Sequence, residues 1–564
     1  MQDINEKMRY DNSLWKVTMG ELLDAVAEKY PDQPCVLYTD RPYRKTYAEF
    51  RDMCNEVAKG LMALGVKKGD HVAIWATNVP EWLMIMWATA KIGAVMVTVN
   101  TAYKFFELEY LLKQSDSTTL ILIDEYKGSD YLKIMHEVYP EIDQAKPGDA
   151  QIENLPYLKN IIHVGPERQK GMFQWEDLYE MAKSVSDEQL AAAQAATDYQ
   201  DVVNMQYTSG TTGFPKGVML THYNVINNGK TIGDGMAFTP EDRLCIPVPF
   251  FHCFGCVLAI MASVTHGTTM VPIDIYHPLK VMQALESEQC TACHGVPTMF
   301  IAMLEHPDFE KFDFSHMRTG IMAGSPCPVA VMKQVVEKMN MREITIVYGL
   351  TEASPGCTMT TTKDSLDIRV NTVGKHFPFV ECKVVDPETG EECPPGVQGE
   401  FMARGYNIMK GYYKMPEATA QAIEPDGWLH SGDLAVMDEN GYFKVTGRIK
   451  DMIIRGGENI YPKEIEEFIY TQEAVSDVQV IGVPSEKYGE EIMACIILKE
   501  GMTMTEDEVK DLVRANMARH KVPRYVRFVD SFPLTASGKI QKYKMREEAI
   551  EYLKLQDIAN IETA

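Results

Sequence analysis

The stretch YTSGTTGFPKG, residues 207–217, brings together hydroxyl side chains, glycines and one lysine. Glycine lets a backbone turn tightly and approach a ligand closely, because no Cβ stands in the way. Successive N–H groups in such a loop form an anion-binding concavity, and Ser and Thr hydroxyls add donors. Lys216 supplies a point charge that suits phosphate. We interpret this stretch as a polyphosphate-binding loop rather than a flexible surface turn.

The loop is not a Walker A loop, which requires Gly-x-x-x-x-Gly-Lys-Ser/Thr. Lys216 stands between a proline and a glycine, so neither register fits. The other Gly-Lys pair, Gly538-Lys539, has Pro533 in place of the first glycine and isoleucine after the lysine. The sequence therefore disfavours a P-loop NTPase.

Composition bounds the class of protein and its partners. The chain has 564 residues, of which 45% are hydrophobic and 24% charged, and single cores stop growing at ~250–300 residues. We expect a globular protein with more than one domain. The net charge of −25 argues against nucleic acid as a partner, since a basic face would be needed. Anionic substrates must instead be met by locally placed Lys and Arg.

One apolar stretch, residues 244–264, contains no Asp, Glu, Lys or Arg. Pro247, Pro249, His252 and Gly255 interrupt it, however, so we expect a buried strand–loop–helix unit and no transmembrane segment. The N-terminus MQDINEKMRY is polar and lacks the apolar core of a signal peptide. These features predict a cytoplasmic protein.

The cysteines offer a competing, non-enzymatic interpretation. Cys253-x-x-Cys256 and Cys290-x-x-Cys293 could pair as a zinc site, and CTACH at 290–294 fits a c-type haem attachment pattern. Haem attachment belongs to exported proteins, whereas QCTACHGVPTMF also fits a buried strand that enters a turn. Free cysteine there would act as a small hydrophobic residue. We therefore predict structural cysteines in a reducing cytosol.

The elements that must position these residues follow a strand–helix alternation. DHVAIWATN, VPEWLMIMWATAK and IGAVMVTVN, within residues 70–100, predict a βαβ unit. Further short β-rich runs are separated by helical segments and lie at 118–124, 159–165, 318–324 and 342–349. This pattern predicts an α/β chain with mostly parallel sheets. Residues 381–405 read as two strands around Pro/Gly turns, which indicates a small β-rich subdomain.

The chain past Gly447 reads as a separate module. YPKEIEEFIY predicts a helix, VQVIGV, IMACIILK and YVRFVD predict strands, and Thr505-x-x-Glu508 is a capping box. About 115 residues are enough for an independent domain. We predict two domains, 1–448 and 449–564, with a hinge within 447–451.

With these elements placed, the sequence resembles the adenylate-forming superfamily of acyl-CoA synthetases, adenylation domains and luciferases. Within it, the chain is similar to the fatty acyl-CoA synthetases, especially the medium-chain acyl-CoA synthetase family member 2 type. Seven signatures stand in order along nearly the whole chain: YTSGTTGFPKGV (207–218), PFFHCFG (249–255), AGSPCP (323–328), YGLTE (348–352), GWLHSGD (427–433), GRIKDMIIRGGENIYPKEIE (447–466) and PLTASGK (533–539).

The resemblance implies a two-step ligation with ATP, Mg²⁺ and coenzyme A. A carboxylate, expected to be a medium- to long-chain fatty acid, attacks the α-phosphate of ATP and forms acyl-AMP with release of pyrophosphate. Coenzyme A then displaces AMP. The resemblance also implies an N-terminal AMP-binding domain of mostly parallel α/β sheets with a small β-rich subdomain, followed by a mobile C-terminal α+β lid.

Motif by motif, the resemblance assigns nucleotide-binding roles. The residues are Thr208, Ser209, Gly210, Thr211, Thr212, Gly213, Lys216, Gly324, Ser325, Pro326, Tyr348, Gly349, Thr351, Glu352, Asp433, Arg448 and Lys539. Tyr348 would stack on adenine, and Thr351 would bond the α-phosphate. Asp433 would accept both ribose hydroxyls, with Arg448 beside it. Glu352, with Thr208, would ligate Mg²⁺.

The resemblance assigns catalysis to Lys539, Thr208, Lys216, Glu352 and His252. Lys539 would bridge the carboxylate and the α-phosphate, Lys216 would neutralise the leaving pyrophosphate, and His252 would border the acyl carboxylate.

Coenzyme A would be met by Gly456 and Gly457, which would line the pantetheine tunnel. Lys450 holds the hinge position, where the family often has Asp. The small domain would rotate there between the two steps.

The sequence leaves alternatives open for the acid and for the acyl acceptor. Gly255, Cys256, Gly324 and residues 353–356 are small and favour an apolar acyl group of medium length, but a missing methylene discriminates by only ~1–3 kcal/mol. An aryl or steroid-like acid stays open, as do a carrier protein in place of coenzyme A and a luciferase-like oxygenase. The partners would be small molecules, and a homodimer is also possible.

Overall fold

The computed structural model describes residues 8, 13–208, 215–324, 327–455, 458–485, 487–517, 519–536 and 538–559. Nine residues assigned to the site lie outside this part of the chain. They are Ser209, Gly210, Thr211, Thr212, Gly213, Ser325, Pro326, Gly456 and Gly457.

The predicted βαβ unit is present near the N-terminus. It consists of β3 (His71–Trp75), α4 (Pro80–Lys91) and β4 (Val95–Thr98), and Val72 pairs in parallel with Met96. Pro80 opens α4, where its missing N–H costs no helical hydrogen bond. Because α4 is apolar on nearly every side, it is buried almost throughout.

This unit belongs to an eight-stranded sheet. Its order is β22 (Gly411–Tyr412), β11 (Lys216–Thr221), β10 (Val202–Thr208), β4, β3, β5 (Ser117–Ile123), β8 (Asn160–Val164) and β9 (Phe173–Gln174). The strands from β10 to β9 pair in parallel, whereas β11 and β22 are antiparallel additions at one edge. That edge carries the phosphate-loop strand.

A second sheet has seven strands and is also mostly parallel. Its order is β16 (Glu343–Thr345), β15 (Thr319–Ile321), β14 (Ala292–Cys293), β12 (Arg243–Ile246), β13 (Thr269–Pro272), β1 (Pro34–Leu37) and β2 (Arg44–Thr46). All neighbours pair in parallel except β1 and β2. The predicted α/β class with mostly parallel sheets is confirmed.

The charge-free stretch 244–264 is buried within the fold, as predicted. It forms β12, a loop, the π-helix Phe254–Met261 and the start of α10 (Ala262–His266). In the described part of the chain, no helix combines the length and apolarity needed to cross a membrane. Cys253 and Cys256 lie in the same core as this stretch, and Cys290 and Cys293 lie in the core of the second sheet.

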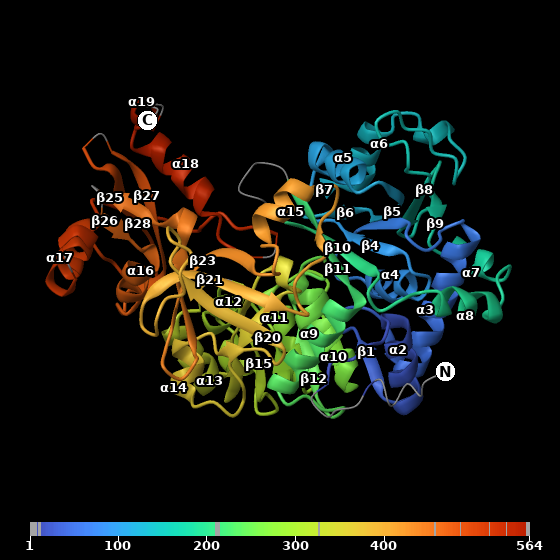
Figure 1. Ribbon diagram of the computed structural model, residues 1–564, viewed down its shortest axis with the longest axis horizontal. Coiled ribbons are helices and arrows are strands. Elements are labelled where there is room, and N and C mark those ends of the chain that lie inside the picture. Colours follow the sequence, from blue (N-terminus) through green and yellow to red (C-terminus); the bar gives the residue numbers. More distant parts are fainter. Residues whose placement is uncertain are drawn as a thin grey trace.

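Helices cover the two sheets. They are α2 (Met19–Lys29), α3 (Tyr47–Ala63), α5 (Phe105–Gln114), α6 (Tyr131–Val138), α7 (Asp177–Ala182), α8 (Asp187–Ala195), α9 (His222–Gly235), α11 (Pro278–Ser287), α12 (Pro297–Leu304), α13 (Val329–Lys338) and α14 (Leu366–Asn371). Side chains of α2, α4, α9 and the π-helix share one core with residues of both sheets, so these helices join the sheets into one body (Figure 1).

Besides the short pair β6 (Glu125–Tyr126) and β7 (Ser129–Asp130), the described part of the large domain contains two smaller sheets. One pairs β17 (Val347–Gly349), β18 (Gly356–Met359) and β19 (Lys375–His376), so the predicted β-rich run at 342–349 divides between two sheets. The other is the predicted β-rich subdomain, an antiparallel sheet in the order β20 (Val380–Val385), β21 (Gln398–Gly405), β23 (Leu429–Met437) and β24 (Phe443–Arg448).

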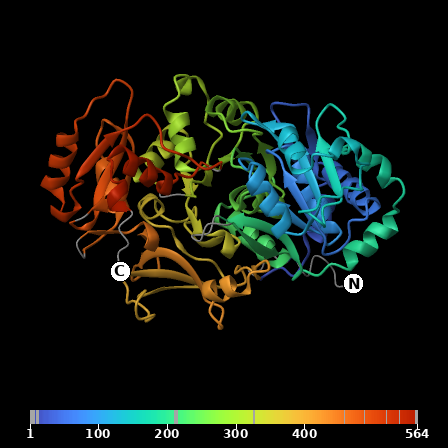
Figure 2. The same ribbon diagram turned by 90° about the horizontal axis from the view of Figure 1, so that it is seen from above.

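The C-terminal module has its own sheet and core. Its strands are β25 (Ile453–Arg455), β26 (Glu458–Ile460), β27 (Val475–Ser485), β28 (Gly489–Leu498) and β29 (Tyr525–Phe528), and its helices are α16 (Pro462–Tyr470), α17 (Glu506–Asn516), α18 (Lys542–Tyr552) and α19 (Gln556–Ala559). The predicted capping box of Thr505 and Glu508 begins α17. Two apolar cores consist of this module's residues alone. Figure 2 shows the module at one end of the molecule.

Candidate active site

Lys539 crosses from the small domain into the large one. It lies between β29 and α18, and its Nζ is 3.4 Å from Nε2 of His252. The backbone oxygen of the neighbouring Gly538 accepts a hydrogen bond of 3.4 Å from Thr298, in the first turn of α12. A Cβ on Gly324 would lie 3.5 Å from Cε of Lys539. The lysine is thus held among residues of the large domain.

Burial controls the charge of both partners. It lowers the pKa of His252 well below its usual value, and Lys539 lowers it further. Nδ1 of His252 accepts a hydrogen bond of 3.1 Å from the backbone N–H of Phe254, so in the neutral ring Nε2 carries the proton. Burial also lowers the pKa of Lys539. Two donors therefore face each other, an arrangement suited to an anion that accepts from both.

Thr351 and Cys253 lie beside this pair. The 3₁₀ turn Thr351–Ala353 follows β17 directly, and Oγ1 of Thr351 is 3.7 Å from Sγ of Cys253. Burial is the main cause that raises the pKa of the Cys253 thiol, to about 11. Cys253 thus stays a neutral thiol at physiological pH, and no thiolate nucleophile forms here.

A second cluster joins Tyr348, Asp433 and Arg448. Asp433 and Arg448 stand opposite each other on β23 and β24, and Nε of Arg448 is 3.2 Å from Oδ1 of Asp433. The Tyr348 hydroxyl donates to Oδ2 of Asp433 at 2.8 Å. Burial raises the pKa of Tyr348, which keeps its hydroxyl a donor. Partners on two neighbouring elements thus hold the Asp433 carboxylate in place.

A third cluster joins Glu352, Tyr412 and Lys216. The Tyr412 hydroxyl donates to Oε1 of Glu352 at 2.8 Å, and Nζ of Lys216 is 4.9 Å from the centre of the Tyr412 ring. Because β22 pairs with β11, the strand that begins at Lys216, the tyrosine lies beside the phosphate loop. Nothing in the sequence singled out Tyr412, since the two tyrosines of GYYK cannot be told apart by pattern.

The donor set fits Mg²⁺ bound together with a phosphate ligand. In the described residues, no group of three or more His, Cys, Asp or Glu side chains could hold a metal ion. Mg²⁺ commonly uses one or two carboxylates and completes its shell with substrate phosphates and water. Glu352 supplies such a carboxylate. Thr208 pairs with Lys216 across β10 and β11, at the base of the phosphate loop.

The Lys539–His252 pair with Cys253, the Asp433 cluster and the Glu352 cluster lie close enough to influence one another electrostatically. Besides burial, the pKa of Lys539 responds to Cys253, Arg448, Asp433 and Glu352, which are drawn from all three clusters. Gly349 has a further role, because a Cβ there would lie 1.8 Å from the Pro355 carbonyl oxygen. That glycine is needed for close backbone packing next to the clusters.

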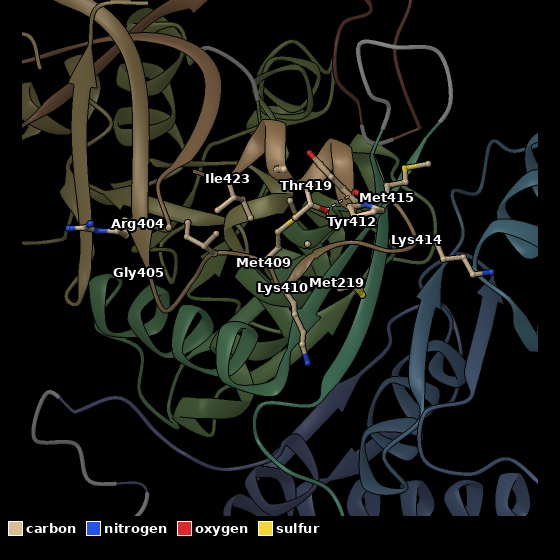
Figure 3. Close-up of a pocket in the computed structure, with 15 residues that line it drawn as sticks. Met219, Arg404, Gly405, Met409, Lys410, Tyr412, Lys414, Met415, Thr419 and Ile423 are labelled. Atoms are coloured by element: carbon tan, nitrogen blue, oxygen red, sulfur yellow. Dashed lines mark hydrogen bonds between the residues drawn. The ribbon is translucent and has the colours of Figure 1, made fainter. Parts of the chain in front are cut away.

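A groove on the described surface is lined in part by Tyr412 but by none of the other residues of these clusters. It has a volume of about 740 Å³ and runs along α15 (Pro416–Ala422). In Figure 3 the charged ends of Arg404, Lys410 and Lys414 point away from its centre, which is lined by apolar side chains such as Met409 and Ile423. This groove offers no phosphate site.

Comparisons with known proteins agree with this geometry. Residues 23–413 match the AMP-binding enzyme family, and residues 464–539 match the AMP-binding enzyme C-terminal domain. The chain is 56% identical to the putative acyl-CoA synthetase YngI of Bacillus subtilis (strain 168), over 95% of this chain and 98% of that protein. It is 42% identical to the mitochondrial medium-chain acyl-CoA ligase ACSF2 of Danio rerio, over 95% and 89% of the two chains.

Solved structures share the fold. The anthranilate CoA ligase AuaEII in complex with anthranoyl-AMP superimposes with a TM-score of 0.84 at 25% identity, covering 96% of this chain and 98% of that one. ATP-bound MatB from Rhodopseudomonas palustris gives a TM-score of 0.80 at 29% identity, covering 95% and 100%. The predicted resemblance is confirmed: the chain belongs to the AMP-binding enzyme family and, within it, to the AMP-forming acyl-CoA synthetases.

Proposed function

We propose that this ligase activates an apolar monocarboxylic acid of medium to long chain as acyl-AMP and transfers the acyl group to coenzyme A. One observation carries the proposal: Lys539 reaches His252 from the other domain and ends 3.4 Å away. A cation and a neutral imidazole donor converge there, beside Thr351. The surrounding side chains are small or apolar, so a carboxylate with an uncharged tail fits.

In the first step, a carboxylate oxygen bonds to the α-phosphorus of ATP while the bond to the pyrophosphate oxygen breaks. The Lys539 ammonium offsets the repulsion between the two anions and holds them at reacting distance. Lys216 and Thr208 meet the negative charge that develops on pyrophosphate. Mg²⁺ held by Glu352 would supply further positive charge to the phosphates.

The nucleoside end of ATP is oriented by the second cluster. Tyr348 packs edge-on against Phe401, with ring centres 4.9 Å apart, so the protein fixes the ring that would stack on adenine. Asp433, already aligned by Tyr348 and Arg448, would accept the ribose hydroxyls. Fixing these groups before ATP arrives reduces the ordering cost of binding.

In the second step, the sulfur of coenzyme A bonds to the acyl carbon, AMP leaves, and the thiol proton passes to solvent. We propose that the small domain, 449–564, rotates about residues 449–451, which form one 3₁₀ turn between β24 and β25. This motion would withdraw Lys539 and present Gly456 and Gly457 to the pantetheine arm.

A panel of carboxylic acids tests the function. Purified protein is incubated with ATP, Mg²⁺ and coenzyme A, and AMP and acyl-CoA are quantified for straight-chain acids of increasing length, an aryl acid and a steroid-like acid. The proposal expects maximal kcat/KM for straight chains of medium to long length. A maximum with the aryl or steroid-like acid would overturn the substrate class, and acyl transfer to a carrier protein but not to coenzyme A would overturn the acceptor.

We further propose that the enzyme works in the cytoplasm and forms a homodimer. All twelve cysteines are described as free thiols, most of them buried, which suits a reducing compartment. Fractionation of cells that express the tagged protein tests the location. Light scattering at micromolar concentration tests the homodimer, which a monomer mass would contradict.

A further inference from the structure

The strand β23 departs from regular pairing with β21 beside the nucleotide cluster. Glu400 pairs with Leu434 and Met402 pairs with His430, so two residue steps along β21 face four along β23. Residues 431–433 therefore form a bulge. Bulges often lie next to active sites, where they redirect a side chain. This one includes the carboxylate residue that would accept the ribose hydroxyls.

The Glu400 side chain holds the middle of the bulge. Its Oε1 accepts a hydrogen bond of 2.9 Å from the backbone N–H of Gly432, and Glu400 is buried, with 8% of its surface exposed. Gly432 has a φ of +69°, a left-handed conformation that glycine adopts without strain. Residues in a bulge lose their ladder partners, and here a carboxylate supplies the acceptor.

Ser431 ties the same bulge to β21 at a second point. Its hydroxyl donates to the Phe401 carbonyl oxygen at 2.5 Å and accepts from the backbone N–H of Asp433 at 3.1 Å. The backbone that leads to Asp433 is thus anchored at two successive N–H groups. Tyr348 and Arg448 hold the carboxylate of Asp433, but its starting point is set from β21.

His430 fixes the direction of the Glu400 carboxylate. Its Nδ1 lies 3.0 Å from Oε2 of Glu400, and its Nε2 lies 3.2 Å from Oε1 of Glu424, in the segment that follows α15. One oxygen of Glu400 therefore faces Gly432 and the other faces His430. The carboxylate cannot rotate without losing one of these contacts.

We propose that Glu400 is a positioning residue for the ribose of ATP, which holds the bulge at 431–433 so that Asp433 meets both ribose hydroxyls. Glu400 acts through Asp433 and not on the nucleotide itself. This inference rests on the proposed function, in which Asp433 binds the ribose. A site that bonds hydroxyls discriminates against the analogue that lacks them, and such a site must be held within about 0.5 Å of its productive geometry.

Equilibrium binding without an acid tests the proposal. Under these conditions no adenylate forms, so the Kd values of Mg²⁺-ATP and Mg²⁺-2′,3′-dideoxy-ATP are measured by calorimetry on the full chain. We expect the parent to bind ATP at least about tenfold more tightly than the dideoxy analogue. In Glu400→Leu this advantage should fall to about twofold, because ATP binds more weakly while the analogue, which lacks both hydroxyls, binds as before.

Two outcomes would overturn the inference. If Glu400→Leu weakens both nucleotides by the same factor, Glu400 is only a structural residue, and the role of Asp433 stands. If the parent itself binds the two nucleotides equally, the role of Asp433 fails together with the inference. The panel of acids tests the proposed function separately, since no acid is present here.

Further variants keep the test independent of the folding of Glu400→Leu. Glu400→Asp keeps the charge but is one methylene shorter, and the advantage of ATP should fall by about threefold. Glu400→Gln keeps an acceptor for the Gly432 N–H and should retain the advantage. As a control, Glu381→Leu removes a carboxylate of β20 that pairs with Arg404 of β21 and should leave the advantage unchanged. Thermal unfolding reports that each variant is folded. An advantage kept in full by Glu400→Asp and Glu400→Leu overturns the assignment.

Discussion

The nucleotide side and the lysine side of the site are built differently. On the nucleotide side, hydrogen bonds and an ion pair within the large domain join Tyr348, Asp433 and Arg448. On the lysine side, the small domain meets the large one through packing of Tyr470 against the apolar core of the second sheet and through polar contacts, such as Thr298 to Gly538 at 3.4 Å. Another joins Ser476 to Glu305 at 2.8 Å. We therefore expect the small domain to move without disturbing the nucleotide side of the site.

The largest effect expected from this difference is a separation of the two half-reactions. Lys539→Ala should reduce acyl-AMP formation by about 10²–10³-fold, because it removes a preorganised charge from the transition state. It should leave the conversion of supplied acyl-AMP and coenzyme A nearly unchanged. Single-turnover measurements of each half-reaction show whether only acyl-AMP formation is affected.

The matched opposite variant is Gly457→Leu, which should form acyl-AMP normally and stall at thioester formation. If both variants lose both half-reactions equally, the two sides of the site are not separable.

A metal titration tests whether Glu352, in the large domain, binds Mg²⁺. Glu352→Gln removes the charge of the proposed Mg²⁺ ligand while keeping its shape and an acceptor for Tyr412. The Mg²⁺ concentration for half-maximal pyrophosphate exchange should rise by about tenfold or more. Superimposable titration curves for the variant and the parent would show that Glu352 has a structural role.

A smaller change in the Mg²⁺ requirement is expected when Tyr412, whose hydroxyl donates to Glu352, is altered. Tyr412→Phe keeps the ring beside Lys216 and removes the hydroxyl that orients Glu352. The Mg²⁺ requirement should rise by roughly 3-fold, because the charge of Glu352 is kept and only its orientation is loosened, with little change in the KM for the acid. Tyr413→Phe, the neighbouring residue, serves as the control and should not move the metal titration.

The smallest expected effect is a pH dependence of folding stability that arises from Asp477 in the small domain. Burial is the main cause that raises the pKa of Asp477 to about 7, and Glu466 and Glu305 add to it. Between pH ~4 and 7 the folded state therefore keeps a proton that the unfolded state loses, so this group lowers stability as pH rises through that window. Above pH 7 the penalty is constant.

Asp477→Asn removes that penalty. The variant should therefore gain stability relative to the parent on going from pH 5 to pH 8, by on the order of 1–2 kcal/mol. Thermal unfolding at both pH values measures it. A gap between variant and parent that is the same at pH 5 and pH 8 would contradict the raised pKa.

The sequence predicted the parts of the fold that depend on local pattern. The βαβ unit, the buried stretch 244–264 and the capping box at Thr505 follow from spacing and residue type, and the structure confirms them. The encounter of Lys539 with His252 could be anticipated only through the family resemblance, since 287 residues separate them. Tyr412 was not predicted, because its place beside Lys216 arises from strand pairing that brings distant segments together.

Lys463 ties the two domains together close to the turn about which we propose they rotate. Its Nζ donates to the Val445 carbonyl oxygen on β24 at 2.6 Å, and burial lowers the pKa of this amine. Breaking this contact loses a hydrogen bond but returns a poorly hydrated cation to water, and these two terms oppose each other. The two orientations of the small domain can therefore lie close in free energy, so that neither half of the catalytic cycle becomes a thermodynamic trap.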